Sequence, residues 1–127
     1  MSLIGGRGDR GSASVWVLAC SALVLLVAVA VSLRAGAVLA RHRAESAADL
    51  AALAAAGRIG MADDVCAPAS PIARVNGAAL VRCRATLAAD GRSGSVDVEV
   101  SIAVRLPGVG WRRATASARA GRLSIDP

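Results

Sequence analysis

The chain contains no phenylalanine, no tyrosine and no lysine, and its aromatic side chains are the two tryptophans Trp16 and Trp111. Aromatic side chains normally supply much of a globular core, yet 55% of these 127 residues are apolar. That apolar content excludes a disordered chain, and the length allows one domain at most. The mean hydropathy of +0.55 is high for a soluble protein, so a membrane segment is expected.

Residues that commonly carry out catalysis are scarce. There is one histidine, His42, between Arg41 and Arg43, and no cysteine or histidine lies at ligand spacing from it. The adjacent pair Asp63 and Asp64 is typical of a solvated turn or helix end. No nucleophile with a nearby base and no phosphate-binding loop is present. The sequence therefore predicts a protein that is not an enzyme and that binds no cofactor, metal or small-molecule substrate.

The positive charge is carried entirely by fifteen arginines, against nine acidic residues, for a net charge of +6. Such a balance raises the possibility of nucleic-acid binding. The arginines are dispersed along the chain, however, and there is no aromatic platform on which bases would stack. We therefore expect no nucleic-acid partner.

One uncharged run of 23 residues extends from Gly11 to Leu33. Since about 20 mainly apolar residues cross a bilayer as a helix, this run predicts a transmembrane helix over 12–34, after a cytoplasmic leader over 1–11. A buried core helix would need partners on all sides. A cleaved secretory signal ending at Ala35-Gly36-Ala37 is the other alternative, although the run is longer than usual for such a signal.

The two sides of this helix differ in ways that bear on orientation. Slightly more arginines follow the span than precede it, which favours a cytoplasmic C-terminal side. Cys66 and Cys83, which lie 17 positions apart, instead suggest a disulfide, and disulfides persist in oxidising compartments. Two reduced, buried thiols are the alternative. We follow the cysteines and expect a single-pass protein of the cell membrane whose C-terminal part is extracytoplasmic.

The helical pattern continues beyond the span, because alanine, the best helix former, dominates an extracytoplasmic extension over 35–57. Small residues recur every fourth position, a spacing that lets helices approach closely in membranes. An alanine-rich composition would also produce such a series by chance. We call this series the small-residue ridge: Ala28, Ser32, Gly36, Ala40, Ala44, Ala48 and Ala52.

After this helix the pattern changes to that of a small sheet. Residues 58–78 are expected to be a linker, because Pro68 and Pro71 would interrupt any helix. Apolar and polar residues then alternate over 81–87 and, most clearly, over 96–106. With a third strand over 111–120, residues 79–127 predict a small antiparallel β domain that packs on the helix between about residues 39 and 53. The expected fold class is therefore α+β.

Two stretches carry a family resemblance: Arg10-Gly11-Ser12-Ala13-Ser14-Val15-Trp16-Val17, and the alanine-rich run from Ala40 to Ala56 that begins Ala-Arg-His-Arg-Ala-Glu. They resemble TadE-like proteins, the pilin-like subunits of tight-adherence (Flp) pilus systems. The closest resemblance is to a short actinobacterial group encoded beside helicase and secretion genes.

The resemblance implies a pilin-like fold and a leader that is removed after Gly11, which leaves Ser12 as the first mature residue. Pilins usually carry glutamate at the fifth mature position, and this position is Trp16 here. That departure favours a minor or pseudopilin subunit, or an unprocessed membrane protein, over a major filament subunit. The implied partners are other pilin-like or secretion-apparatus subunits, bound through the N-terminal helix.

The leading functional hypothesis is thus a structural membrane component of a Flp-type pilus or of a pilus-derived secretion apparatus. The alternative is a secreted or membrane-tethered basic module that binds an anionic polymer of the cell envelope. The arginines of the predicted sheet region motivate that alternative: Arg82, Arg84, Arg105, Arg112, Arg113, Arg119 and Arg122.

Overall fold

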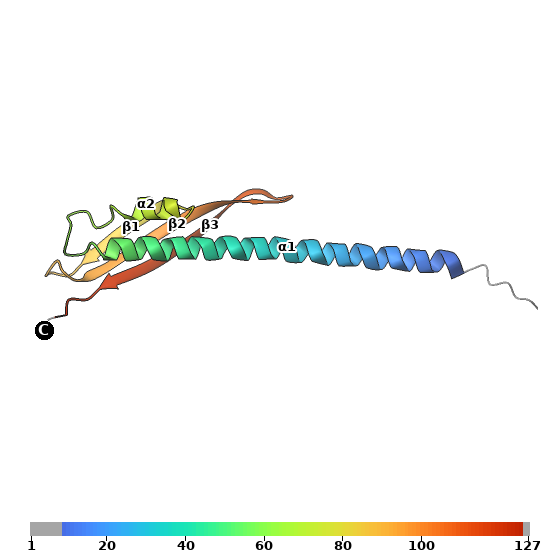
Figure 1. Ribbon diagram of the computed structural model, residues 1–127, viewed down its shortest axis with the longest axis horizontal. Coiled ribbons are helices and arrows are strands. Elements are labelled where there is room, and N and C mark those ends of the chain that lie inside the picture. The colour runs from blue at the N-terminus through green and yellow to red at the C-terminus, as the bar shows by residue number, and fades with distance from the viewer. Residues whose placement is uncertain (1–8, 126–127) are drawn as a thin grey trace, which may run out of the picture. The chain divides into compact units, whose positions relative to one another are not determined.

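The computed structural model describes residues 9–125, which form two helices and one three-stranded sheet (Figure 1). The elements are α1 (Asp9–Ala56), α2 (Ala69–Val75), β1 (Ala79–Leu87), β2 (Gly94–Leu106) and β3 (Gly110–Arg122). The chain divides into two compact units, one that ends at Ala35 and one that begins at Gly36. The α+β fold class is confirmed. Most of the leader expected over 1–11 lies outside the described residues.

Helix α1 ends where glycines interrupt the alanine-rich sequence, as expected. The amide of Gly57 still donates to the carbonyl of Leu53 at 3.0 Å, and Gly60 then adopts a φ of +77°. That left-handed conformation suits glycine because it has no Cβ. At its other end, α1 begins at Asp9, three residues before the position expected for the span.

The sheet is antiparallel, in the order β1-β2-β3. Val98 in the central strand lies opposite Cys83 on one side and Ala118 on the other. The alternating pattern of β2 is confirmed, because Val96, Val98 and Val100 are buried while the residues between them are partly exposed. One face of the sheet is therefore apolar, as the period of two predicts.

The core of the unit that begins at Gly36 consists almost entirely of small side chains. Its largest fully buried residues are Ile59, Val96, Val98 and Val100. Alanines of α1 cover these valines: Ala47, Ala48, Ala51, Ala52, Ala55 and Ala56. The same cluster includes residues of the 57–78 segment and of β3: Val65, Ala69, Ala73, Ala78 and Ala120. The expected packing of the sheet on the second half of α1 is confirmed. Alanine on the helix lets the sheet come close without aromatic residues.

The segment after α1 contains a short helix that the sequence analysis did not expect. Pro68 is the N-cap of α2, and Pro71 stands in its first turn, where backbone amides have no helical carbonyl to bond. Both prolines are therefore compatible with the helix that they were expected to exclude. Asn76 is the C-cap, and the amides of Gly77 and Ala78 donate to the carbonyls of Arg74 and Ala73. This bond pair is a Schellman motif, which ends the helix at the predicted turn.

An irregularity in β1 changes which of its residues face the core. The register with β2 shifts between Leu80 and Arg82, so Val81 is an extra residue in the ladder. Val81 is exposed, whereas Leu80 packs against the core. The simple alternation expected from Val81 onward is thus wrong at its first residue, because a β-bulge offsets the side-chain period.

Candidate functional site

The first half of α1 presents an apolar surface with no protein covering it. Its most apolar 18-residue window has a mean hydropathy of 2.6 and is 0% buried. The large side chains from Val15 to Val31 are all more than half exposed, Trp16 among them at 70%. The core helix of a soluble protein would be mostly covered. By length and composition α1 can cross a membrane, and a signal sequence shares both properties.

The hydroxyl group of Ser32, within this helix, forms its hydrogen bond inside the helix itself. The hydroxyl of Ser32 donates to the carbonyl oxygen of Ala28, four residues earlier, at 2.8 Å. This local bond lets a serine lie in an apolar environment, where an unpaired hydroxyl would be costly.

The small-residue ridge does not lie on a single surface. Ala28, Ser32 and Gly36 are exposed, and a Cβ added at Gly36 would meet no atom within 4 Å. The remaining ridge residues are buried within the unit that begins at Gly36: Ala40, Ala44, Ala48 and Ala52. A row of residues four apart turns by about 40° per step around a helix. The ridge therefore winds onto the face that the chain's own sheet covers.

The outward face of the second half of α1 carries a feature that the sequence analysis missed. Leu39, Leu50 and Leu53 are 52%, 44% and 62% exposed. At about 100° per residue they fall within an arc of about 60°, roughly opposite the buried alanines. A helix of a soluble protein places its large apolar residues inward. Here the inward face is alanine and the outward face carries leucines, which we call the leucine face (Leu39, Leu50 and Leu53). The sequence carried a signal for this face: Leu39 and Leu50 are 11 residues apart and Leu50 and Leu53 are three apart, spacings that place them on one side of a helix.

The charged residues of α1 form a local cluster on its surface. The Nε of Arg41 donates to Glu45 at 2.9 Å, and His42 Nδ1 lies 3.4 Å from the same carboxylate. The hydrogen bond from Arg41 lowers the pKa of Glu45 below its ordinary value. Asp49, on the same row, is exposed. Over residues 9–125, no group of three or more His, Cys, Asp or Glu side chains could hold a metal ion.

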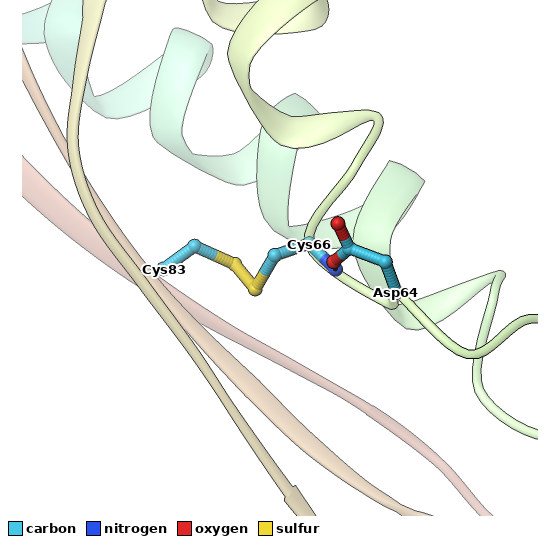
Figure 2. The surroundings of a disulfide bond; sticks show 3 residues. All are labelled: Asp64, Cys66 and Cys83. Carbon is cyan, nitrogen blue, oxygen red and sulfur yellow. Dashed lines mark hydrogen bonds between the residues drawn. A yellow bond between two sulfur atoms is a disulfide. The ribbon is translucent and has the colours of Figure 1, made fainter.

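Cys66 and Cys83 form a disulfide, with their Cα atoms 6.0 Å apart (Figure 2). The bond joins the segment after α1 to strand β1. The amide of Cys66 also donates to the carboxylate of Asp64 at 3.0 Å, so the pair Asp63 and Asp64 contributes a turn, as the sequence suggested. Cys20, within the apolar part of α1, is a free, exposed thiol.

The arginines of the sheet region do not make one uniform patch. On the outer face, Arg82 pairs with Glu99 at 2.9 Å, and Arg119 makes two bonds to Asp97, at 2.8 and 3.0 Å. These bonds raise the pKa of Arg119 above its ordinary value. Arg122, on the opposite face, donates to the carbonyl of Ile59 at 2.8 Å. Because several arginines are engaged within the chain, this face is less suited to a polyanion than their number suggests.

The residues expected at a leader cleavage site, Gly11 and Ser12, are exposed and lie within the first turns of α1. The structure therefore brings together only the two cysteines and the buried half of the ridge among the predicted site residues. The leader site and the exposed ridge residues lie along α1, away from any cluster of chemically reactive groups in the described chain.

Comparison with family models finds a match over most of α1. No curated protein and no solved structure shows detectable similarity to the chain. The family model does not test the narrower resemblance to the actinobacterial group, which stays a prediction. Residues 11–58, which cover nearly all of α1 and the turn that follows it, match the family model described as putative Flp pilus-assembly TadE/G-like.

Proposed function

We propose that this protein is a single-pass, pilin-like or pseudopilin component of a Flp-type pilus or of a pilus-derived secretion apparatus. Its role is structural and non-enzymatic. The observation that carries the proposal is the uncovered apolar surface of α1, in the same residues that match the pilus-assembly family. Such a surface must be covered by lipid or by other helices.

We propose further that α1 binds neighbouring subunits through two surfaces that its own sheet leaves free. One is the exposed part of the small-residue ridge at Ala28, Ser32 and Gly36, where backbones can approach closely. The other is the leucine face, which would extend the contact beyond the bilayer. The disulfide supports an extracytoplasmic position for the unit that begins at Gly36.

The mature N-terminus and the cellular fraction test the proposal together. Removal of a leader after Gly11 predicts a membrane-bound protein that begins at Ser12. A membrane-bound protein that keeps Met1 would retain the structural role but contradict leader removal. A secreted protein that begins at Val38 would contradict the membrane role, and a soluble cytoplasmic protein with Met1 would overturn the whole proposal.

Disulfide cross-linking tests the subunit contact at the ridge. In a Cys20→Ser background, Ser32→Cys places a thiol on the exposed ridge, and Ala30→Cys places one at nearly the same level but about 160° around the helix. We expect oxidation in native membranes to cross-link the Ser32→Cys protein to itself or to a partner much more than the Ala30→Cys protein. Equal cross-linking of the two variants would contradict packing at the ridge.

A further inference from the structure

The β2–β3 hairpin extends beyond the core of its unit. The buried valines of β2 end at Val100, but the strand continues to Leu106 and the chain returns from Gly110. At the turn, the amide of Val109 donates to the carbonyl of Leu106 at 3.1 Å, and Gly108 has a φ of +77°. We call residues 104–113 the hairpin tip.

The hairpin tip combines positive charge with exposed apolar surface. Arg105, Arg112 and Arg113 are all exposed, Trp111 is 67% exposed and Val109 is half exposed. The sequence from Val100 to Ile125 contains five arginines and no acidic residue. The acidic residues of the outer sheet face, Asp97 and Glu99, are bonded to arginines other than these three. Trp111 is half of the aromatic content of the chain, and it lies in this cluster.

The hairpin tip lies at a defined end of its unit. The bond from Arg122 to the carbonyl of Ile59 holds the open end of the hairpin beside the C-terminal end of α1. The turn therefore lies at the other end of the sheet, away from the C-terminal end of α1 (Figure 1). It is directed toward the entry end of the unit, by which we mean the end at which the unit begins at Gly36. With 13 residues, β2 is about 43 Å long, whereas residues 36–56 of α1 extend about 30 Å. The strand is thus long enough to reach the entry end.

We propose that the hairpin tip binds the head-group surface of the bilayer that α1 spans, and this rests on the proposed membrane function of α1. The apolar span immediately precedes Gly36 in the sequence, so the entry end of the unit is the end nearest the bilayer. Tryptophan concentrates at membrane interfaces, and arginines beside a membrane are attracted by anionic lipids. The span holds the hairpin near that surface, so even weak contacts are occupied. Exposed Trp111 and Val109 favour lipid over an anionic polymer, which offers no apolar phase.

The two tryptophans allow the span and the hairpin tip to be examined separately in the full chain. Trp16→Phe leaves Trp111 as the single fluorophore, and Trp111→Phe leaves Trp16. Each variant is reconstituted into phosphatidylcholine vesicles with and without phosphatidylglycerol. Brominated lipids, with bromine near the head groups or near the bilayer centre, then quench fluorophores at the matching depth.

We expect lipids brominated near the head groups to quench Trp111, more strongly when phosphatidylglycerol is present, and its emission to shift to shorter wavelength. Trp16 should be quenched by brominated lipid in both compositions. If Trp16 is quenched and Trp111 emits as in water in both vesicles, the hairpin proposal is wrong while the span stands. If Trp16 is not quenched, the span itself is wrong. Shielding of Trp111 by added polyphosphate but not by anionic lipid would also overturn the proposal.

A charge-matched pair of variants tests the arginines. Arg105→Gln, Arg112→Gln and Arg113→Gln together should weaken the hairpin's attraction to anionic vesicles by about fivefold for each arginine. The control replaces three exposed arginines away from the tip, Arg58, Arg74 and Arg92, and changes the net charge equally. If both triple variants lose Trp111 quenching equally, the tip has no special role and the proposal fails. Circular dichroism and an intact Cys66–Cys83 bond verify the fold of each variant.

Discussion

Arg122 donates a hydrogen bond from its guanidinium to the backbone carbonyl of Ile59 at 2.8 Å, across 63 positions of sequence. Ile59 is fully buried just after α1, and Arg122 is the last residue of β3. The bond thus joins the end of the helix to the end of the sheet. It gives a donor to a backbone carbonyl in the turn after α1, and it sets which end of the hairpin lies near the end of α1.

Replacing Arg122 with methionine should lower the free energy of unfolding by about 1–2 kcal/mol, because a partly buried carbonyl loses a charged donor. Denaturant unfolding in detergent micelles measures the change. The control is Arg84→Met, on the exposed outer face of β1, for which we expect little effect. Equal losses in the two variants would show that the bond to Ile59 contributes nothing specific.

Removal of the disulfide should destabilise the unit more than any loss of a single surface contact. Cys66→Ser with Cys83→Ser opens a loop with a sequence separation of 17, worth about 3 kcal/mol in the chain-entropy model. The denaturant midpoint measures the loss, and Cys20→Ser is the matched control because that thiol is free. Non-reducing electrophoresis should show a mobility change on reduction in the parent and the control only. Unchanged stability in the double variant would contradict a structural role for the bond.

The two faces of α1 should respond oppositely to changes in side-chain size. Ala48 is fully buried, so Ala48→Leu forces extra volume against the sheet and should lower the free energy of unfolding by about 1–3 kcal/mol or more. Leu53 is 62% exposed, so Leu53→Ala should change it by less than about 0.5 kcal/mol. If the leucine face binds a subunit, Leu53→Ala should instead reduce co-purification of partner subunits. A large loss of intrinsic stability in Leu53→Ala would contradict this division.

Gly94, the first residue of β2, should tolerate no side chain. Its φ is +154°, and an added Cβ would collide with the carbonyl oxygen of Thr86 and lie 2.9 Å from the Cα of Leu87. Because backbone atoms must move, Gly94→Ala should cost more than about 1 kcal/mol of unfolding free energy. Gly36→Ala is the control, since it adds a Cβ that meets no atom within 4 Å in a helix. A neutral Gly94→Ala would show that the β1–β2 connection relaxes easily.

Acid should weaken the loop that joins β1 to β2. The amides of Arg92 and Ser93 donate to Asp90, and these bonds lower its pKa below the ordinary value of 3.8. The unfolded state therefore binds a proton more readily than the folded state, and stability falls as pH decreases below the ordinary value toward the lowered one. Asp90→Asn cannot titrate, so its stability should change less over that range. Denaturant midpoints at neutral pH and below pH 3.8 measure the difference, and identical losses would exclude Asp90.

The sequence predicted the elements that follow strong local patterns. The uncharged run from Gly11 and the alanines after it predicted α1, and the alternation over 96–106 predicted β2 with only its first residues missed. Pro68 and Pro71 predicted an interrupted helix, yet α2 forms there, because a proline in the first helical turn removes no helical bond. Val81 was expected to face the core and is exposed, because a bulge is set by pairing with β2 and not by the local pattern. Both errors concern effects that depend on neighbouring structure.

The sequence by itself predicted a long apolar helix, a small sheet without aromatic mass, and two cysteines at a spacing that allows a bond. Periodicity and hydropathy are local properties, so they can be read from the chain directly. Only the tertiary structure decided which side of α1 the sheet covers. That placement buries Ala40, Ala44, Ala48 and Ala52 of the ridge and leaves Leu39, Leu50 and Leu53 exposed. The physical reason is the size of the helix side chains. The valines of the sheet can come closer to a helix face made of alanines than to one made of leucines, so the sheet packs on the alanine side.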